Sequence, residues 1–320
     1  MTKIISFIHG LYPRSENLVM VSRDADRGRK TADDLANAQE RDTQALLAKQ
    51  KSLGFSYIED GKFLWDDIFR PIIESTEGFS VGPITRWFDN NNFYKEPIIT
   101  GKLRVDMQKL AHYFPAITPK EKWKVTLPSP YLFAKLTKSK NPMTFENILF
   151  QVTLVIRDVI AYLETQGVAF IQLNEPAMPY YGATKKELGL FAKAIKKLTL
   201  PEKQHKLVVH FYFGDATSAI KSLVSEKIGI DGIGVDFYKT SLTSLPKKMP
   251  YTLLAGIMDG RNSLLENEVQ LKKFIRAIIK RYKPEVLYIS SNSDLELLPE
   301  AVAKNKLAIL GNLQKAFAKK

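Results

Sequence analysis

Short apolar runs alternate with amphipathic segments along most of the chain. Runs such as Leu-Val-Val-His-Phe at 207–211 are typical of buried parallel strands. Segments with apolar residues three and four positions apart, most clearly 145–166, are typical of helices. The predicted strands are 3–8, 55–58, 123–127, 168–173, 206–211, 233–236, 252–257 and 286–290, and the predicted helices are 31–53, 145–166, 185–197, 216–227, 266–282 and 301–317.

Eight strands that alternate with helices predict an α/β protein, specifically a (β/α)8 TIM barrel. The alternative is an open doubly wound sheet, which usually has a glycine-rich phosphate turn after its first strand; the turn at 9–14 lacks that pattern. The segment 74–122 does not fit the repeat and is rich in aromatic residues and asparagine near its middle. We expect one domain over residues 1–320, with 74–122 as a long insertion over the barrel mouth.

Composition places the chain among ordinary globular proteins, with 45% hydrophobic and 25% charged residues. No apolar run approaches the roughly 18 residues of a membrane span, so no membrane association is expected. The chain has no cysteine, which excludes disulfides and thiolate metal ligands and fits a reducing, cytoplasmic location.

The formal net charge is +13. The lysines are dispersed at helical spacing, as on solvent faces, and no nucleic-acid-binding module accompanies them. We therefore expect no nucleic acid partner. An anionic small-molecule ligand, an acidic protein partner and simple solubility remain open explanations.

Polar residues follow most of the predicted strands. The strand 252–257 leads to Asp259, Arg261 and Asn262, with Gly260 expected to allow a tight turn. In α/β folds the carboxyl ends of the strands form the ligand-binding edge, although salt-bridged turns and helix caps give the same pattern. The other strand-end candidates are Arg14, Asn174, Glu175, His210, Tyr212, Asp236 and Ser291, of which His210 and Asp236, with Asp259, are candidate catalytic groups.

Two common site types are not supported. The four histidines show no HExxH or HxH spacing, so no metal site is expected in this chain. No GxSxG elbow is present for a serine nucleophile.

Five segments, taken in order, resemble one family. They are Trp-Phe-Asp-Asn-Asn at 87–91, Ile-Gln-Leu-Asn-Glu-Pro-Ala at 171–177, Tyr-Phe-Gly-Asp at 212–215, Gly-Ile-Met-Asp-Gly-Arg-Asn at 256–262 and Ser-Ser-Asn-Ser-Asp-Leu at 290–295. Together they are similar to the cobalamin-independent methionine synthase family, and most closely to its N-terminal barrel, which lacks zinc. The opening Leu-Tyr-Pro-Arg at 11–14 resembles the start of that domain.

The resemblance implies a methyl-transfer context. The family enzyme has two barrels and moves a methyl group from polyglutamylated 5-methyltetrahydrofolate to homocysteine, whose thiol is activated by zinc in the C-terminal barrel. That zinc is held by a His-x-Cys pair, a Glu and a second Cys. The corresponding positions here are His210, Tyr212, Asp236 and Ser293, so both cysteines are missing. Zinc is therefore expected in a separate partner chain, and no cofactor is assigned to this one.

The resemblance also suggests a folate contact. The family's N-terminal barrel uses a lysine just before the Trp-Phe pair to bind the folate glutamate tail, and Arg86 stands at that position beside Trp87 and Asp89. The segment after Arg14 departs from the family's pattern, and Asn174 replaces an aspartate. Folate thus remains a possible ligand.

Three functions stay open. The first is a subunit of a split methionine synthase, inactive alone and paired with a zinc-bearing C-terminal-type barrel. The second is an independent methyltransferase, or a pterin- or corrinoid-binding barrel of the same superfamily. The third is a non-catalytic scaffold that retains a polar rim.

Overall fold

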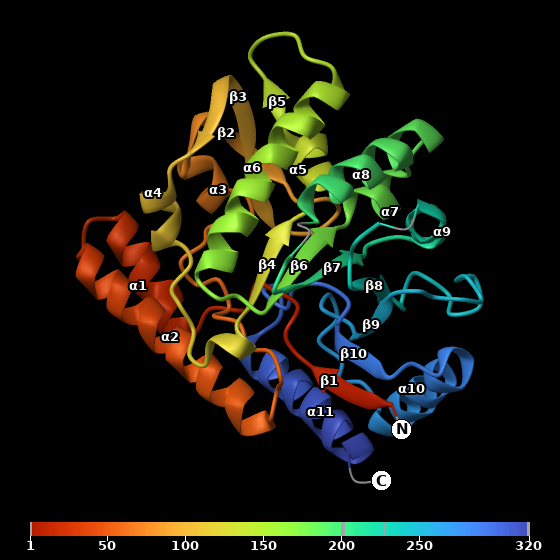
Figure 1. Cartoon of the computed structure of the whole chain (residues 1–320). Helices are drawn as coiled ribbons and strands as arrows, with labels where there is room; N and C mark the ends of the chain where they lie inside the picture. Colours follow the sequence, from red (N-terminus) through yellow and green to blue (C-terminus); the bar gives the residue numbers. More distant parts are fainter. Residues whose placement is uncertain (1, 200–201, 227, 319–320) are drawn as a thin grey trace. The chain divides into compact units, whose positions relative to one another are not determined.

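The computed structural model describes residues 2–199, 202–226 and 228–318 (Figure 1). The chain divides into two compact units. Unit 1 comprises Met1–Leu64 and Gly256–Lys320, and unit 2 comprises Trp65–Ala255.

Unit 2 contains a parallel sheet whose strands pair in the order β4, β6, β7 and β8. Leu173 of β6 and Val209 of β7 are fully buried and apolar. Helices follow β4, β6 and β7 in the chain, as the sequence pattern predicts, and α5, α6 and α8 lie in succession beside the strands (Figure 1). The elements are β4 (Lys124–Pro128), α5 (Pro130–Leu136), α6 (Phe145–Thr165), β6 (Phe170–Glu175), α7 (Ala177–Tyr181), α8 (Lys185–Leu198), β7 (Lys206–Phe211), α9 (Thr217–Glu226) and β8 (Gly232–Asp236).

The predicted insertion forms a second, smaller sheet in unit 2. Strands β2 (Thr76–Arg86) and β3 (Phe93–Val105) form an antiparallel hairpin, and β5 (Lys138–Ser139) pairs with β3 in parallel. At the tip, Trp87 donates its N–H to the carbonyl of Asn92. The flanking helices are α3 (Arg70–Glu74), α4 (Met107–His112) and the 3-10 turn η1 (Lys120–Lys122).

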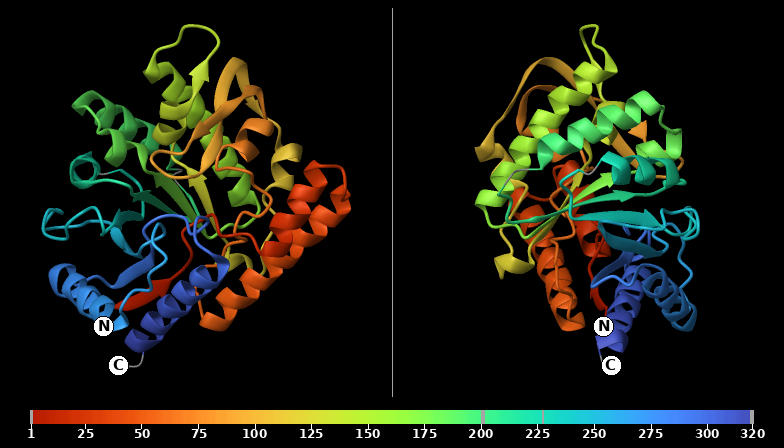
Figure 2. Two further views of the ribbon diagram at one scale, coloured as in Figure 1. Left: turned by 180° about the vertical axis from the view of Figure 1, so that it is seen from behind. Right: turned by 45° about the vertical axis from the view of Figure 1, so that its right-hand side comes forward.

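Unit 1 pairs β1 (Lys3–Ser6) with β10 (Val286–Ser291) in parallel. Helix α11 (Glu300–Ala318) packs on β1, and α1 (Glu16–Asp26) packs on α2 (Ala32–Leu53) (Figure 2). Helix α2 begins with a capping box, in which Thr31 and Asp34 satisfy each other's backbone N–H groups. Helix α10 (Glu268–Tyr282) precedes β10.

Strand β9 (Thr252–Met258) crosses the boundary between the units. In unit 2, Thr252 donates its N–H to the carbonyl of Asp231; in unit 1, Met258 accepts from the N–H of Asn292. Among the described residues, seven of the eight predicted strands are present, as β1, β4 and β6 to β10. The eighth predicted strand is the one that differs.

The predicted strand at 55–58 was wrong. This segment makes only an isolated bridge at Ile58. The side chain of Gln50, in the preceding helix, donates to the carbonyl of Glu59 at 2.7 Å and accepts from the N–H of Glu59 at 3.1 Å. Because this side chain takes up both backbone groups of Glu59, the residue that directly follows the segment needs no strand partner.

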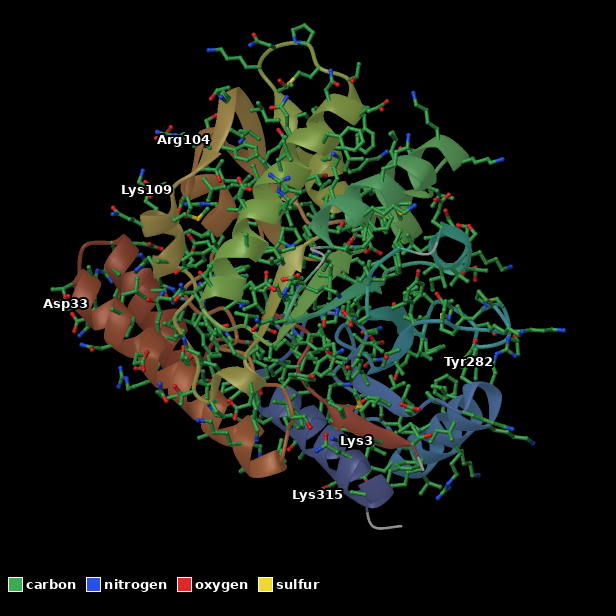
Figure 3. All side chains as sticks on the ribbon, viewed as in Figure 1. Lys3, Asp33, Arg104, Lys109, Tyr282 and Lys315 are labelled. Atoms are coloured by element: carbon green, nitrogen blue, oxygen red, sulfur yellow. The ribbon has the colours of Figure 1, made fainter. Side chains whose placement is uncertain are left out.

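Most other boundaries agree with the sequence to within two residues, and the predicted end of α9, Lys227, lies outside the described residues. The short helices α5 and α7, and also α1, were not predicted. Many charged side chains point into solvent, including the labelled Lys3, Asp33, Arg104, Lys109 and Lys315 (Figure 3). Within the described ranges, no helix combines the length and apolar content that a membrane span needs.

Candidate functional site

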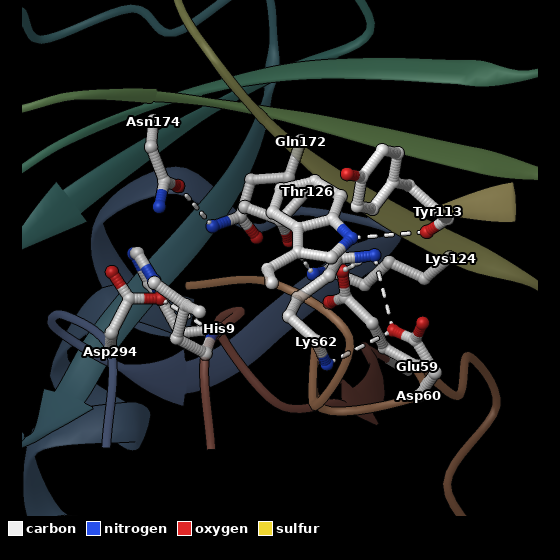
Figure 4. A network of polar contacts seen from close by, with 12 residues as sticks. His9, Glu59, Asp60, Lys62, Tyr113, Lys124, Thr126, Gln172, Asn174 and Asp294 are labelled. Atoms are coloured by element: carbon white, nitrogen blue, oxygen red, sulfur yellow. Dashed lines mark hydrogen bonds and ion pairs between the residues drawn. The ribbon is translucent and has the colours of Figure 1, made fainter. Parts of the chain in front are cut away.

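The parallel strands of unit 2 carry a polar face opposite their apolar face. Side chains alternate along each strand, so residues in register share a face. Thr126 is in register with Gln172, and Asn174 with His210. These side chains and that of Lys124 are almost completely buried. Gln172 donates to Asn174 at 2.8 Å, and the Lys124 ammonium to Thr126 at 2.6 Å (Figure 4).

This face brings two predicted site residues together, Asn174 and His210. Sequence reasoning missed Lys124, Thr126 and Gln172, which extend the polar face toward the amino ends of β4 and β6. The sequence pattern could have identified these residues, because apolar and polar residues alternate in Lys-Val-Thr-Leu at 124–127 and Ile-Gln-Leu-Asn at 171–174. A parallel strand buried on both faces is normally apolar throughout, so this alternation marks a polar interior.

The imidazole of His210 lies over a glycine of the neighbouring strand. His210 is in register with Gly234, and a Cβ atom at Gly234 would stand 2.5 Å from the His210 Cγ atom. Any side chain at 234 would displace the ring. The glycine therefore fixes where the buried imidazole can lie.

Asp236, at the end of β8, holds backbone groups. One carboxylate oxygen accepts from the N–H of Tyr238 at 2.9 Å, and the other from the N–H of Phe213 at 3.3 Å. The side chain is 1% exposed. Asp236 therefore fixes the loop that follows β7. This loop contains Tyr212, whose fully buried ring lies 5.9 Å from the His210 ring, measured between centroids.

Glu175 faces away from Asn174, because successive strand residues point to opposite faces. Its carboxylate accepts from the Ser129 hydroxyl, the N–H of Leu132 at 3.1 Å and the N–H of Met178 at 2.8 Å. It thus joins the first turns of two helices, α5 and α7. Burial raises the pKa of Glu175 to about 7, although these hydrogen bonds oppose the shift. The geometry makes Glu175 a structural group of unit 2.

We predict a pH dependence from this carboxyl. The folded state binds its proton more tightly than the unfolded state, whose pKa is near 4.5, so stability falls as pH rises from about 4.5 to about 7. The difference corresponds to about 3 kcal/mol. Glu175→Gln should remove this loss in chemical unfolding measured across that range.

Glu187 provides the control. Hydrogen bonds from Thr184 and the neighbouring Lys135 and Tyr131 outweigh its partial burial and lower the pKa of Glu187 to about 2. Its stabilisation is present above pH 4.5 and is lost as pH falls toward 2. Glu187→Gln should therefore lower stability at neutral pH and leave the slope between 4.5 and 7 unchanged. An unchanged slope in Glu175→Gln would contradict the first prediction.

The hairpin tip carries the other candidates of unit 2. Trp87 is buried, with its ring centroid 5.9 Å from that of Phe69, and is a core residue. Arg86 is exposed, with its guanidinium 6.0 Å from the centre of the Phe93 ring, and Asp89 is exposed. Of these predicted contacts, Arg86 and Asp89 can reach a ligand from solvent.

An aromatic cluster at the hairpin tip was not predicted. The ring of Phe88 lies 5.6 Å from Phe213, 4.9 Å from Tyr180 and 5.5 Å from Tyr181, measured between centroids. Both phenylalanines have positive φ, +52° for Phe88 and +71° for Phe213, a conformation that is strained for bulky residues. Because Tyr180 follows β6 and Phe213 follows β7, the tip of the insertion lies at the carboxyl ends of these strands. The predicted position of the insertion is thus correct within unit 2.

In unit 1, the loop after β9 is internally tied. Asp259 accepts from the N–H of Arg261 at 3.0 Å, and Asn262 from the N–H of Leu264 at 3.0 Å. A Cβ atom at Gly260 would stand 2.5 Å from the Asp294 carbonyl oxygen. Gly260 is thus required for close packing, and its φ lies outside the left-handed region that favours glycine. Arg261 and Asn262 are exposed.

The segment after β10 packs against this loop. Asn292, at the end of the eighth predicted strand, accepts from the N–H of Gly260 at 2.9 Å and donates to Asp259 at 3.4 Å. Ser291 is buried, and its hydroxyl has no hydrogen-bond partner among the described residues. Arg14 is half-buried directly before α1. Asp259 and Ser291 are therefore carried by adjoining segments of unit 1.

Unit 1 also contains buried contacts between ionisable side chains. His9 lies 3.3 Å from Asp294, whose carboxylate also accepts from the N–H of Leu11 (Figure 4). The ammonium of Lys62 lies 3.0 Å from Glu59 and 3.1 Å from Asp60. The contacts of Lys62 compensate buried charges within unit 1.

The residues at the zinc-equivalent positions do not suit zinc. Both Asp236 oxygens already accept backbone N–H groups, and Ser293 donates to Asn292 at 3.2 Å. Tyr212 and Ser293 are neutral hydroxyls where a soft metal requires thiolates. Across residues 2–199, 202–226 and 228–318, no group of three or more His, Cys, Asp or Glu side chains could hold a metal ion.

Residues 76–283 match the family described as cobalamin-independent synthase, N-terminal domain. This match covers more than half of the chain. The chain belongs to this family. The resemblance inferred from the sequence motifs is confirmed.

Curated relatives carry the name methionine synthase. The protein from Sulfolobus acidocaldarius is 24% identical over 316 residues, which is 96% of this chain and 90% of that protein. The protein from Sulfurisphaera tokodaii is 24% identical over 304 residues, or 93% of this chain and 88% of that protein. These relatives are therefore of similar length to this chain.

Solved structures confirm the fold class. A B12-independent methionine synthase from Shewanella sp. W3-18-1, in complex with selenomethionine, superposes with a TM-score of 0.76 at 16% identity over 98% of this chain and 97% of that one. A putative vitamin-B12 independent methionine synthase from Listeria monocytogenes gives 0.74 at 17% identity over 97% and 96%. The chain has the α/β, TIM-barrel-type fold of these proteins.

Proposed function

We propose that this chain is one subunit of a split cobalamin-independent methionine synthase. It would support transfer of a methyl group from a 5-methyltetrahydrofolate-type donor to homocysteine, together with a separate zinc-bearing barrel. The observation that carries the proposal is the family match to an N-terminal domain in a chain without cysteine. A Lewis acid such as thiolate-held zinc lowers the pKa of a bound thiol, so that the nucleophilic thiolate is available near neutral pH.

Two further observations support a two-chain enzyme. Relatives named methionine synthase have about the length of this chain, which is the length of one barrel. Single-barrel chains with that name therefore exist. The exposed Arg86 offers a planar guanidinium at the hairpin tip, suited to the carboxylates of a polyglutamate tail. We propose folate as the ligand of this chain, zinc as the partner's cofactor, residues 1–320 as one domain and the cytoplasm as the location.

The test is reconstitution. The chain, a cysteine-bearing C-terminal-type barrel from the same genome, and their mixture would be assayed for methionine formation from homocysteine and 5-methyltetrahydropteroyltriglutamate. We expect activity in the mixture at least about tenfold above either chain alone, with zinc in the partner. Full activity of the partner alone would contradict the proposal, as would activity of this chain alone.

Arg86 provides a sharper test of the donor. Arg86→Ala should raise KM for the triglutamate donor more than for the monoglutamate form, because a distal carboxylate loses its cation. Arg157→Ala removes an exposed guanidinium from α6 in the same unit and is the matched control. If Arg86→Ala changes KM equally for both donors, Arg86 does not bind the glutamate tail of the folate.

A further inference from the structure

The loop between β9 and α10 displays aliphatic side chains to solvent. Leu264 is 74% exposed, Leu265 is 51% exposed, and Val269, in the first turn of α10, is 61% exposed. Single exposed apolar residues are common, but three within six positions form a patch. Such patches typically mark interaction surfaces.

This loop is rigidly built. The N–H of Leu264 donates to Asn262 at 3.0 Å, and its carbonyl accepts from the Lys306 ammonium at 2.9 Å. Lys306, on α11, also contacts Glu266 at 2.6 Å, and its side chain is fully buried. Glu266 in turn accepts from the N–H of Asp259 at 2.7 Å. Burying the Lys306 ammonium costs desolvation free energy, and its contacts with Glu266 and the Leu264 carbonyl offset that cost. These contacts hold the loop in place.

A basic stripe continues from the patch along α10. Val269, Lys273, Arg276 and Lys280 recur at helical spacing and are all exposed, so they share the solvent face of the helix. The opposite face buries Leu271, with other aliphatic residues. In the part of the chain that the structure describes, none of the three basic side chains forms an ion pair.

We propose that Leu264, Leu265, Val269 and the basic stripe of α10 form the docking surface for the zinc-bearing partner barrel. This inference rests on the proposed function. A partner that fits this surface would present an apolar groove for the two leucines, flanked by carboxylates that face Lys273, Arg276 and Lys280. Charge complementarity of this kind sets association rate and orientation, and the buried leucines supply affinity. The patch follows the Asp-Gly-Arg-Asn segment at the carboxyl end of β9, so docking here covers that end of the strand.

Two features favour a protein partner over a lipid surface. The apolar side chains are few and are held on a fixed loop, whereas helices that lie in a membrane interface have an apolar face along their length. The apolar face of α10 is already buried within unit 1. The stripe therefore remains available for pairing with carboxylates.

The experiment measures binding of the purified, full-length chain to the cysteine-bearing barrel used in the reconstitution. Leu264→Ser/Leu265→Ser should raise Kd about tenfold or more. Lys273→Glu/Arg276→Glu/Lys280→Glu should lower the association rate and reduce its salt dependence. Val19→Ser/Met20→Ser, which replaces exposed apolar residues of α1 in the same unit, should leave Kd unchanged. All substituted side chains are exposed, so thermal unfolding should stay within a few degrees of the wild type.

The outcomes separate this inference from the proposed function. If the wild type binds and activates the partner and the patch variants do so equally well, the docking surface is wrong and the split enzyme stands. If the partner neither binds nor activates the wild type, both fall. Binding of the wild type, but not the leucine variant, to phosphatidylglycerol–phosphatidylcholine vesicles would assign the patch to a membrane instead. Leucine-dependent dimerisation in analytical ultracentrifugation would assign it to a second copy of this chain.

Discussion

Replacing Lys306 by methionine is expected to lower the free energy of unfolding by about 3–5 kcal/mol, because it removes the cation from a buried ion pair. The Lys306 ammonium contacts the Glu266 carboxylate, 8% exposed at its side chain, and the carbonyl of Leu264. Methionine fills similar volume, so lost packing contributes little. The measurement is chemical unfolding at neutral pH.

Lys304→Met is the matched control on the same helix. Lys304 pairs with Glu300, but their side chains are 51% and 34% exposed, and such solvent-accessible pairs contribute at most about 1 kcal/mol. The double variant Lys306→Met/Glu266→Gln should recover part of the loss, since it leaves no buried carboxylate without this cation. If Lys306→Met costs no more than Lys304→Met, the ion pair does not stabilise the fold.

The same substitution has a local consequence. Without Lys306, the carbonyl of Leu264 loses its donor, and amide hydrogen exchange should accelerate across residues 259–267 before it does in β10. The leucines would then be displayed by a mobile loop. Weaker partner binding in this variant, with both leucines intact, would separate presentation of the patch from its composition.

The sequence predicted the strands better than the side-chain contacts around them. Strand β7 was predicted to the residue because its apolar run is long enough to be unambiguous. The segment 55–58 is also mostly apolar, but it forms no strand ladder, and the side chain of Gln50 satisfies both backbone groups of the next residue, Glu59, a contact that periodicity cannot reveal. Propensity and pattern carry no information on which side chain reaches back to the backbone.

The candidate site shows a similar limit. Positions at strand ends were predictable, but the role of each side chain was not. Asn174 and Glu175 are consecutive, so their opposite orientation follows from the strand period alone and could have been predicted. The contact of Phe88 with Phe213 joins segments far apart in the chain and depends on two strained backbone conformations. Such contacts are set by tertiary packing, which a single sequence does not display.

Gly214→Ala should destabilise the chain by about 3 kcal/mol. A Cβ atom at this position would stand 2.1 Å from the carbonyl oxygen of Pro179, so backbone must move. Neither the loop that contains Gly214 nor the segment that contains Pro179 can move easily. The loop is fixed by Asp236, which accepts from the N–H of Phe213, and Pro179 lies within α7, whose start is tied to Glu175. The glycine of the Tyr-Phe-Gly-Asp segment is thus explained by packing.

Gly189→Ala tests whether the effect is local. Gly189 lies inside α8 in the same unit with nothing within 4 Å of an added Cβ, so alanine should stabilise by about 0.5–1 kcal/mol. Gly214→Ala should also change the near-ultraviolet circular dichroism, because displacement of the loop separates the ring of Phe213 from Phe88 and its tyrosine neighbours. Equal stability of the two variants would show that the segment tolerates a side chain at 214. The positive φ of Phe213 would then need another explanation, such as contact with a ligand.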